Sequence, residues 1–104
     1  MAQFDIHARP GRHPDDPLHF LLDLQADLLD TLQTRLVAPL ARLDSVQTPI
    51  RTLNPRVDVH GESFLLLTHL CAAVPLRSLG ETIGTARGQR DEIVKAIDLL
   101  VTGI

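Results

Sequence analysis

Residues 93–104 read Ile-Val-Lys-Ala-Ile-Asp-Leu-Leu-Val-Thr-Gly-Ile, and their pattern differs from that of the chain before them. The apolar residues recur at i, i+3, i+4, i+7 and i+8, which is the spacing of one face of an α-helix. They are Ile93, Ala96, Ile97, Leu100 and Val101. Glycine often follows the last turn of a helix, so Gly103 is expected to end this one. The sequence predicts a C-terminal helix whose apolar stripe packs on the rest of the protein.

Earlier in the chain, apolar residues mostly alternate with polar ones, which is the period of half-buried β-strands. Strands are predicted at residues 3–8, 18–24, 36–38 and 72–74, and a hairpin from residues 57–59 and 63–68 around Gly61-Glu62. Proline should end the third strand at Pro39, and Pro75 allows residues 72–74 at most an edge position. Residues 10–17 hold three prolines and a glycine and predict an exposed loop. Residues 42–49 predict a second loop or a short edge ribbon.

Many short strands followed by one helix predict a mainly β fold, a small antiparallel barrel capped by the helix. The 104 residues are expected to form a single domain over residues 1–104. A chain of this size buries little surface alone, and its only aromatic residues are three phenylalanines. A homodimer interface would bury more apolar surface.

Composition argues against several classes of protein. The formal net charge is -3, whereas proteins that bind nucleic acid by themselves need cations to neutralise phosphates. The one cysteine, Cys71, cannot form an internal disulfide, no stretch is long enough to span a membrane, and the N-terminus has no secretory pattern. We expect a cytoplasmic protein with a protein partner, no contact with a membrane and no cofactor.

Two clusters of ligand-type residues favour ordinary structural roles. His60, His69 and Cys71 are the best candidates for a metal site, but no fourth ligand accompanies them, so no metal is expected. The acidic residues Asp23, Asp27 and Asp30 are predicted to form a solvated face and a turn rather than a hydrolytic site.

Five segments together resemble one protein family. They are Leu24-Gln25-Ala26-Asp27-Leu28-Leu29-Asp30, Val37-Ala38-Pro39-Leu40, Asn54-Pro55-Arg56-Val57, Val74-Pro75 and Ile97–Ile104. Their order and spacing resemble the CcdB family, toxins that poison DNA gyrase and are neutralised by a CcdA antitoxin. The resemblance covers roughly residues 3–104. It implies an SH3-like barrel of the CcdB/MazF type, working as a two-fold homodimer.

The resemblance implies that the helix end binds the gyrase A subunit and traps its cleaved DNA complex. This is binding rather than catalysis, so the chain is not expected to be an enzyme. The implied gyrase-binding residues are Ala26, Leu28, Asp98, Thr102, Gly103 and Ile104. Thr102 stands where the family has a tryptophan that stacks on a gyrase arginine, and Asp98 stands where it has an asparagine. The other interpretation of Leu28 is packing within its own chain.

A CcdA-like antitoxin is the second implied partner, expected to be a disordered segment that orders over the toxin. Its predicted contacts lie on the two loops, at Arg9, Gly11, Arg12, His13, Asp44 and Gln47.

Two alternatives remain. Because threonine offers no stacking surface, the chain can also be interpreted as a detoxified homologue that only dimerises and binds antitoxin, for sequestration or autoregulation. The lesser alternative is a MazF-like endoribonuclease, in which Arg9 or Arg12 binds phosphate and His7 or His13 serves as the base.

Overall fold

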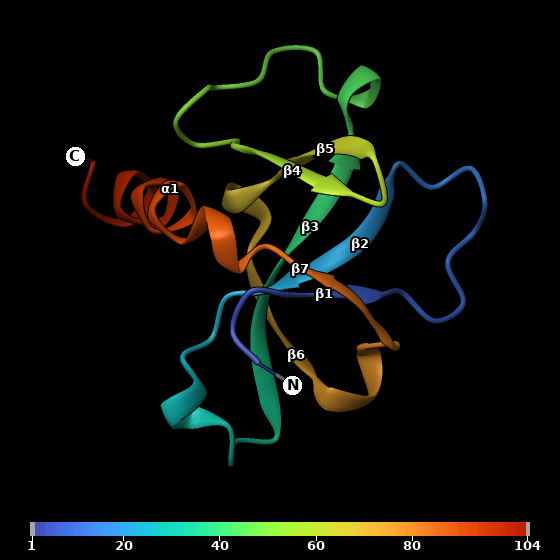
Figure 1. The fold of residues 1–104 in the computed structure, drawn as a ribbon, viewed down its shortest axis with the longest axis vertical. Coiled ribbons are helices and arrows are strands. Elements are labelled where there is room, and N and C mark those ends of the chain that lie inside the picture. The colour runs from blue at the N-terminus through green and yellow to red at the C-terminus, as the bar shows by residue number, and fades with distance from the viewer. Residues whose placement is uncertain (1, 104) are drawn as a thin grey trace.

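A computed structural model describes residues 2–103. Over these residues the chain forms seven strands followed by one helix (Figure 1). The strands are β1 (Asp5–Ala8), β2 (Leu18–Asp23), β3 (Thr34–Arg42), β4 (Arg56–Val59), β5 (Glu62–Leu66), β6 (Ala72–Pro75) and β7 (Thr82–Thr85), and the helix is α1 (Arg90–Thr102). The predicted mainly β fold with a C-terminal helix is confirmed.

The strands form one antiparallel sheet that curls into a half-barrel. Its order is β4-β5-β3-β2-β1-β7, and β6 pairs with the first half of β3. The curl brings the two end strands, β4 and β7, to the same side of the molecule (Figure 1). No helix within residues 2–103 has the length and apolar character needed to cross a membrane.

Side chains connect β4 and the turn after it to β7 and to the segment that precedes α1. An imidazole nitrogen of His60, Nε2, lies 2.9 Å from the carbonyl oxygen of Ile83, and the Gln89 side-chain amide donates to the carbonyl of Arg56. His60 and Gly61 both have positive φ, of 51° and 82°, as a two-residue type I′ hairpin turn requires. The turn therefore lies one residue earlier than the predicted Gly61-Glu62 turn.

The core fills the inside of the curled sheet and includes residues from α1. Leu22, Leu40 and Leu66 from the central strands are fully buried, and Ile93 of α1 packs into the same cluster. Burying a side chain of this size contributes about 1.5–3 kcal/mol, so this contact fixes the helix across the open side of the sheet.

Two strand predictions were wrong. Strand β3 does not end at Pro39 but continues to Arg42. The Pro39 carbonyl accepts from the N–H of Leu67, at the point where the partner of β3 changes from β6 to β5. In an extended residue the backbone nitrogen and the carbonyl face the same neighbouring strand. The N–H that Pro39 lacks would therefore lie where β6 ends and β5 begins, so its absence costs no hydrogen bond between strands.

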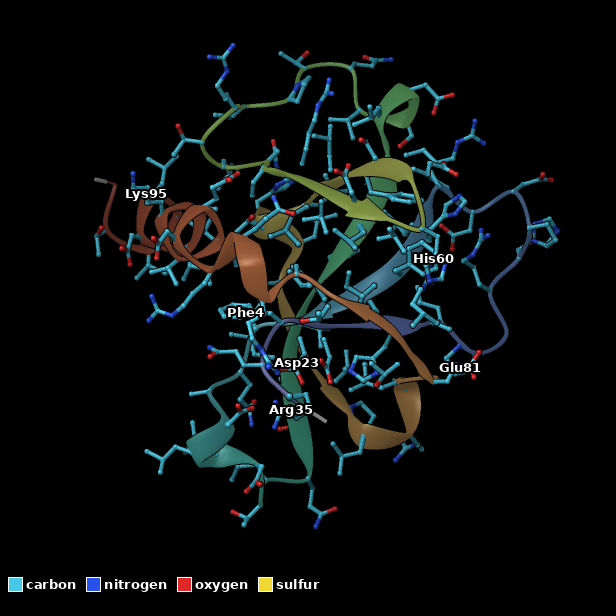
Figure 2. All side chains as sticks on the ribbon, in the orientation of Figure 1. Phe4, Asp23, Arg35, His60, Glu81 and Lys95 are labelled. Carbon is cyan, nitrogen blue, oxygen red and sulfur yellow. The ribbon has the colours of Figure 1, made fainter. Side chains whose placement is uncertain are left out.

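Strand β1 begins at Asp5, later than predicted, because Phe4 has a φ of 69°. A bulky residue in this region is unusual and strained. The Phe4 N–H donates to the carbonyl of Asp23 at 2.7 Å, and its own carbonyl accepts from Ala86 at 2.8 Å. These bonds and burial of the ring hold the conformation (Figure 2). His7 on the opposite face of β1 is also buried, so the strand is covered on both sides.

Candidate functional site

Helix α1 presents its end to solvent. Ile93 and Ala96 are fully buried and Ile97 is partly buried, as the apolar stripe predicts. The prediction that the whole apolar stripe packs on the protein was wrong for the last turn, because Leu100 is 39% exposed and Val101 is 75% exposed. The chain therefore covers Leu100 only in part and leaves most of Val101 open to solvent.

The chain's own bonds fix the helix end. The Thr102 hydroxyl donates to the carbonyl of Asp98 at 2.7 Å, and the Gly103 N–H donates to the carbonyl of Leu99 at 3.0 Å. Gly103 has a φ of 76°, a left-handed conformation that glycine adopts without steric cost and that ends helices. Asp98, Thr102 and Gly103 are exposed together, whereas Ile104 lies outside the described residues.

The second part of the predicted gyrase-binding set lies on η1 (Asp27–Leu29), a single 3-10 turn after β2. Ala26 precedes this turn and is exposed, and Leu28 is 91% exposed. The alternative of packing within the chain is therefore wrong for Leu28. Figure 1 shows η1 and the end of α1 on the same side of the molecule but apart, so one chain does not join them into one surface.

Both arginines predicted for antitoxin contact stabilise their own loop. Arg9 pairs with Asp16 at 3.0 Å and also donates to the carbonyl of Leu18. Arg12 donates to the carbonyls of His13 and Asp16, at 3.0 and 2.7 Å. The backbone N–H of Leu18, and then Arg9, hold the pKa of Asp16 below its ordinary value. The loop has a defined shape in which His13 and Gly11 are exposed.

The two predicted antitoxin loops meet at one end of the sheet. The Arg42 N–H donates to the carbonyl of Pro17 at 3.3 Å, and Arg42 pairs with Asp44 at 3.1 Å on the surface. Between the loops lies His19, whose ring packs against Phe20 and Phe64. Burial, followed by the charge of Arg12, lowers the pKa of His19. Gln47 lies beyond Asp44, exposed on the second loop.

The prediction that the three acidic residues lie on a solvated face and a turn was wrong for Asp23. Asp23 is fully buried and pairs with Arg35 (Figure 2), with Oδ2 and Nη2 2.7 Å apart. Asp27 accepts from the N–H of Gln3. Sequence reasoning missed Arg35, although its alternation with Val37 places it on one face of a strand. Asp30 is exposed, as expected for a turn.

The histidines considered as a base for RNA cleavage or as metal ligands do not come together in one site. His7 is 1% exposed, its Nδ1 lies 3.1 Å from the carbonyl oxygen of Gly80, and Nε2 has no partner. A base at this position cannot reach an RNA substrate. His69 and His60 are exposed. Within residues 2–103, no three His, Cys, Asp or Glu side chains gather as metal ligands would.

The chain as a whole can be compared with known protein families. A family model described as CcdB protein matches residues 3–103, which is nearly the whole chain and includes both the curled sheet and α1. The chain therefore belongs to the CcdB family.

Proposed function

We propose that this protein is the toxin of a type II toxin–antitoxin module, which binds the DNA gyrase A subunit as a homodimer and traps the cleaved DNA complex. Membership of the CcdB family supports a toxin of a toxin–antitoxin module in general. Gyrase binding and dimerisation are the specific parts of the proposal.

The exposed end of α1 is the observation that carries the proposal. Val101, Thr102 and Gly103 are exposed, and the capped last turn holds them in a fixed conformation. An ordered, exposed segment loses little conformational entropy on binding. Leu28 offers a second exposed apolar side chain on the same side of the molecule, and a homodimer would bring further copies of both elements together.

A second candidate is a detoxified homologue that keeps dimerisation and antitoxin binding. The hydroxyl of Thr102 is already bonded to the carbonyl of Asp98, so this side chain leaves chiefly a methyl group for a partner. A tryptophan over an arginine contributes about 0.5–2 kcal/mol from the cation–π interaction alone. Without it, contact must come from Val101, the backbone of Gly103 and η1.

In both candidates a CcdA-like antitoxin covers the loops that meet at His19. Gly11, His13, Asp44 and Gln47 are exposed for such contact, whereas Arg9 and Arg12 would act by holding the first loop in shape.

A DNA cleavage assay tests the proposal. Supercoiled plasmid, gyrase, ATP and increasing protein should yield linear, gyrase-linked DNA, and the antitoxin should abolish it. Normal supercoiling at a large excess of folded protein, repeated with gyrase from the same source, favours the detoxified homologue.

A further inference from the structure

The chain leaves the sheet for η1 at a pair of residues that share only one of the two bonds typical of antiparallel strands. The Leu24 N–H donates to the carbonyl of Leu36 on β3 at 2.8 Å. The Leu36 N–H donates not to Leu24 but to the side-chain oxygen of Gln25, Oε1, at 3.0 Å. The Leu24 carbonyl accepts instead from the side-chain amide of Gln3 at 3.2 Å. Two glutamine side chains therefore take the place of one bond between strands.

Gln25 is bonded within the chain through all four of its polar groups. Its backbone N–H donates to the Asp23 carboxylate at 2.9 Å, and its carbonyl accepts from Arg35 at 3.3 Å. Its side chain accepts from Leu36 on β3 and donates through Nε2 to the carbonyl of Leu29, the last residue of η1, at 3.0 Å. The half-buried Gln25 thus connects β3 with the end of η1.

The turn η1 has few other contacts that fix its shape. None of its residues is buried, Leu28 is 91% exposed, and Ala26 before it makes no side-chain cap. One end is held where the Asp27 carboxylate accepts from the N–H of Gln3 at 2.7 Å. The other end is held by the side chain of Gln25. Because a turn without buried apolar groups opens easily, these polar bonds decide how ordered it is.

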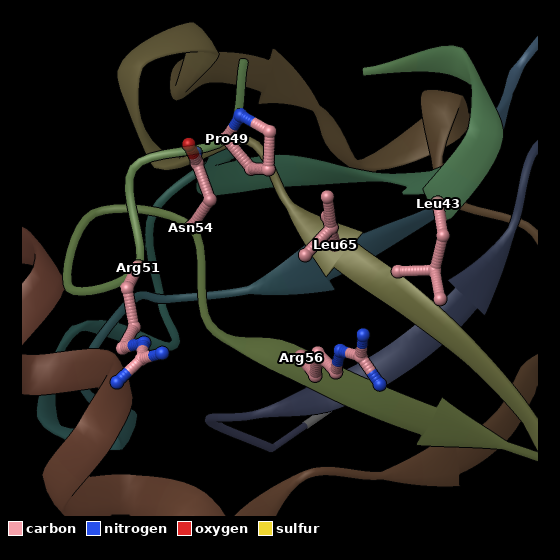
Figure 3. A pocket seen from close by; sticks show the side chains of 6 residues that line it. All are labelled: Leu43, Pro49, Arg51, Asn54, Arg56 and Leu65. Carbon is pink, nitrogen blue, oxygen red and sulfur yellow. The ribbon is translucent and has the colours of Figure 1, made fainter. Parts of the chain in front are cut away.

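Asn54 fixes another loop by the same means. It lines the hollow beside β4, and its side-chain amide accepts from the N–H of Ile50 and donates to the carbonyl of Leu66 on β5, both at 3.0 Å (Figure 3). A planar amide carries an acceptor and a donor on one group, so it can bond a strand and a loop at once. Gln25 does this between β3 and η1, and Asn54 does it between β5 and the loop before β4.

We propose that Gln25 is a positioning residue, which holds η1 in the conformation that presents Leu28 to the gyrase A subunit. The inference rests on the proposed function, since Leu28 belongs to the predicted gyrase-binding residues. The polar groups of Gln25 are already bonded within the chain, so its contribution to binding comes through the turn. An apolar side chain on an ordered turn loses less conformational entropy on binding than one on a turn that must first be ordered.

Two variants of Gln25 separate its two side-chain bonds. Gln25→Glu keeps an oxygen that accepts from the Leu36 N–H but has no N–H to donate to the Leu29 carbonyl. Gln25→Met has a similar length and makes neither bond. The matched control is Gln33→Met, an exposed glutamine directly before β3 whose side chain makes no hydrogen bond within residues 2–103.

NMR on the free protein measures what the bonds hold. In Gln25→Met the Leu36 amide should exchange with solvent at least about tenfold faster, and the order parameter of the Leu28 amide should fall from about 0.85 to below about 0.6. Gln25→Glu should keep the exchange rate of Leu36 within about twofold of the natural protein and still lower the order parameter of Leu28. The control should change neither quantity.

Calorimetric titration of the gyrase A subunit then tests whether Gln25 acts through Leu28. Gln25→Met should raise the Kd by about five- to tenfold, because the turn has to be ordered on binding. In a chain that already carries Leu28→Ala, the same substitution should raise the Kd by less than about twofold, which is the signature of two coupled residues. Urea denaturation confirms that each variant is folded under the conditions of the titration.

The inference is overturned if Leu28 is as ordered in Gln25→Met as in the Gln33→Met control. It is also overturned if the effects of Gln25→Met and Leu28→Ala on the Kd are additive, because Gln25 would then not act through Leu28. Failure of the natural protein to bind gyrase would overturn the proposed function instead, and the NMR measurements would still decide whether Gln25 holds η1.

Discussion

Arg35 and Asp23 form an ion pair across β2 and β3 in which both side chains are at most 1% exposed. Asp23 also accepts from the N–H of Gln25 at 2.9 Å, and Arg35 donates to the carbonyl of Gln25 at 3.3 Å. The pair thus ties the end of β2 to the segment that leads into η1. It supports the turn that presents Leu28 to solvent.

Asp23→Asn should lower the free energy of unfolding by about 3 kcal/mol or more, because it leaves Arg35 as a buried charge without its counterion. Urea denaturation measures this loss. The control is Asp44→Asn, which removes a pair that is more than half exposed on both sides and should cost less than about 1 kcal/mol. Equal losses for the two variants would show that burial of the Arg35 pair has no energetic consequence.

Gly80→Ala should destabilise the fold by about 1–3 kcal/mol. A Cβ at this position would lie 2.6 Å from the carbonyl oxygen of Ala8, which is backbone within a paired strand and has little room to move. Thermal unfolding measures the effect. Gly88→Ala is the control, since nothing lies within 4 Å of its Cβ, and it should shift stability by less than about 1 kcal/mol. A stable Gly80→Ala variant would contradict the close approach of these two segments.

Stability should fall as the solution becomes more acidic than the ordinary histidine pKa of 6.5, partly because of His19. Burial, followed by the charge of Arg12, lowers the pKa of His19 in the folded state. At a pH between the pKa of His19 in the folded protein and its ordinary pKa, the unfolded chain binds more protons than the folded one. The contribution of His19 to stability is therefore present above pH 6.5 and is lost as the pH falls through this window.

His19→Phe should flatten this part of the pH profile while keeping the ring contacts with Phe20 and Phe64. Urea midpoints measured across the window provide the comparison. An identical slope in the variant and the natural protein would mean that other groups carry the acid sensitivity.

Thr102→Trp should raise affinity for the gyrase A subunit by about 30-fold or more, the scale of one interface hot spot. The indole would supply the stacking surface that threonine lacks, on a helix end that is already exposed and capped. Calorimetric titration measures the gain, and growth arrest on expression is its cellular counterpart. Thr102→Val, which removes only the bond to the Asp98 carbonyl, serves as the control and should stay near the natural affinity. If Thr102→Trp gives no gain, the end of α1 does not face a gyrase arginine.

Local patterns predicted much of the fold. The helix stripe correctly placed Ile93, Ala96 and Ile97 against the core, and alternation located β2 and the β4–β5 hairpin. The errors arose where a distant segment decides the outcome. Pro39 is tolerated because β3 changes partner there, and Val101 is exposed because the sheet ends before the helix does. Strand β7 carries Gly84 within a short run and gave too weak an alternation to be predicted.

The family resemblance assigned Thr102 and Gly103 to gyrase binding; both residues are exposed, and the assignment itself stays a prediction. Sequence patterns held no indication that Arg9 and Arg12 stabilise their own loop, because hydrogen bonds to the carbonyls of that loop depend on the loop's path.

The most direct test of the central claim is calorimetric titration of the gyrase A subunit with the natural protein and with a chain that ends at Val101. We predict that the natural protein binds and that removing Thr102–Ile104 weakens binding by about 30-fold or more, while thermal unfolding confirms that both chains are folded. Equal binding by the two chains, or no binding by the natural protein, would contradict the claim that the exposed end of α1 is the gyrase-binding element.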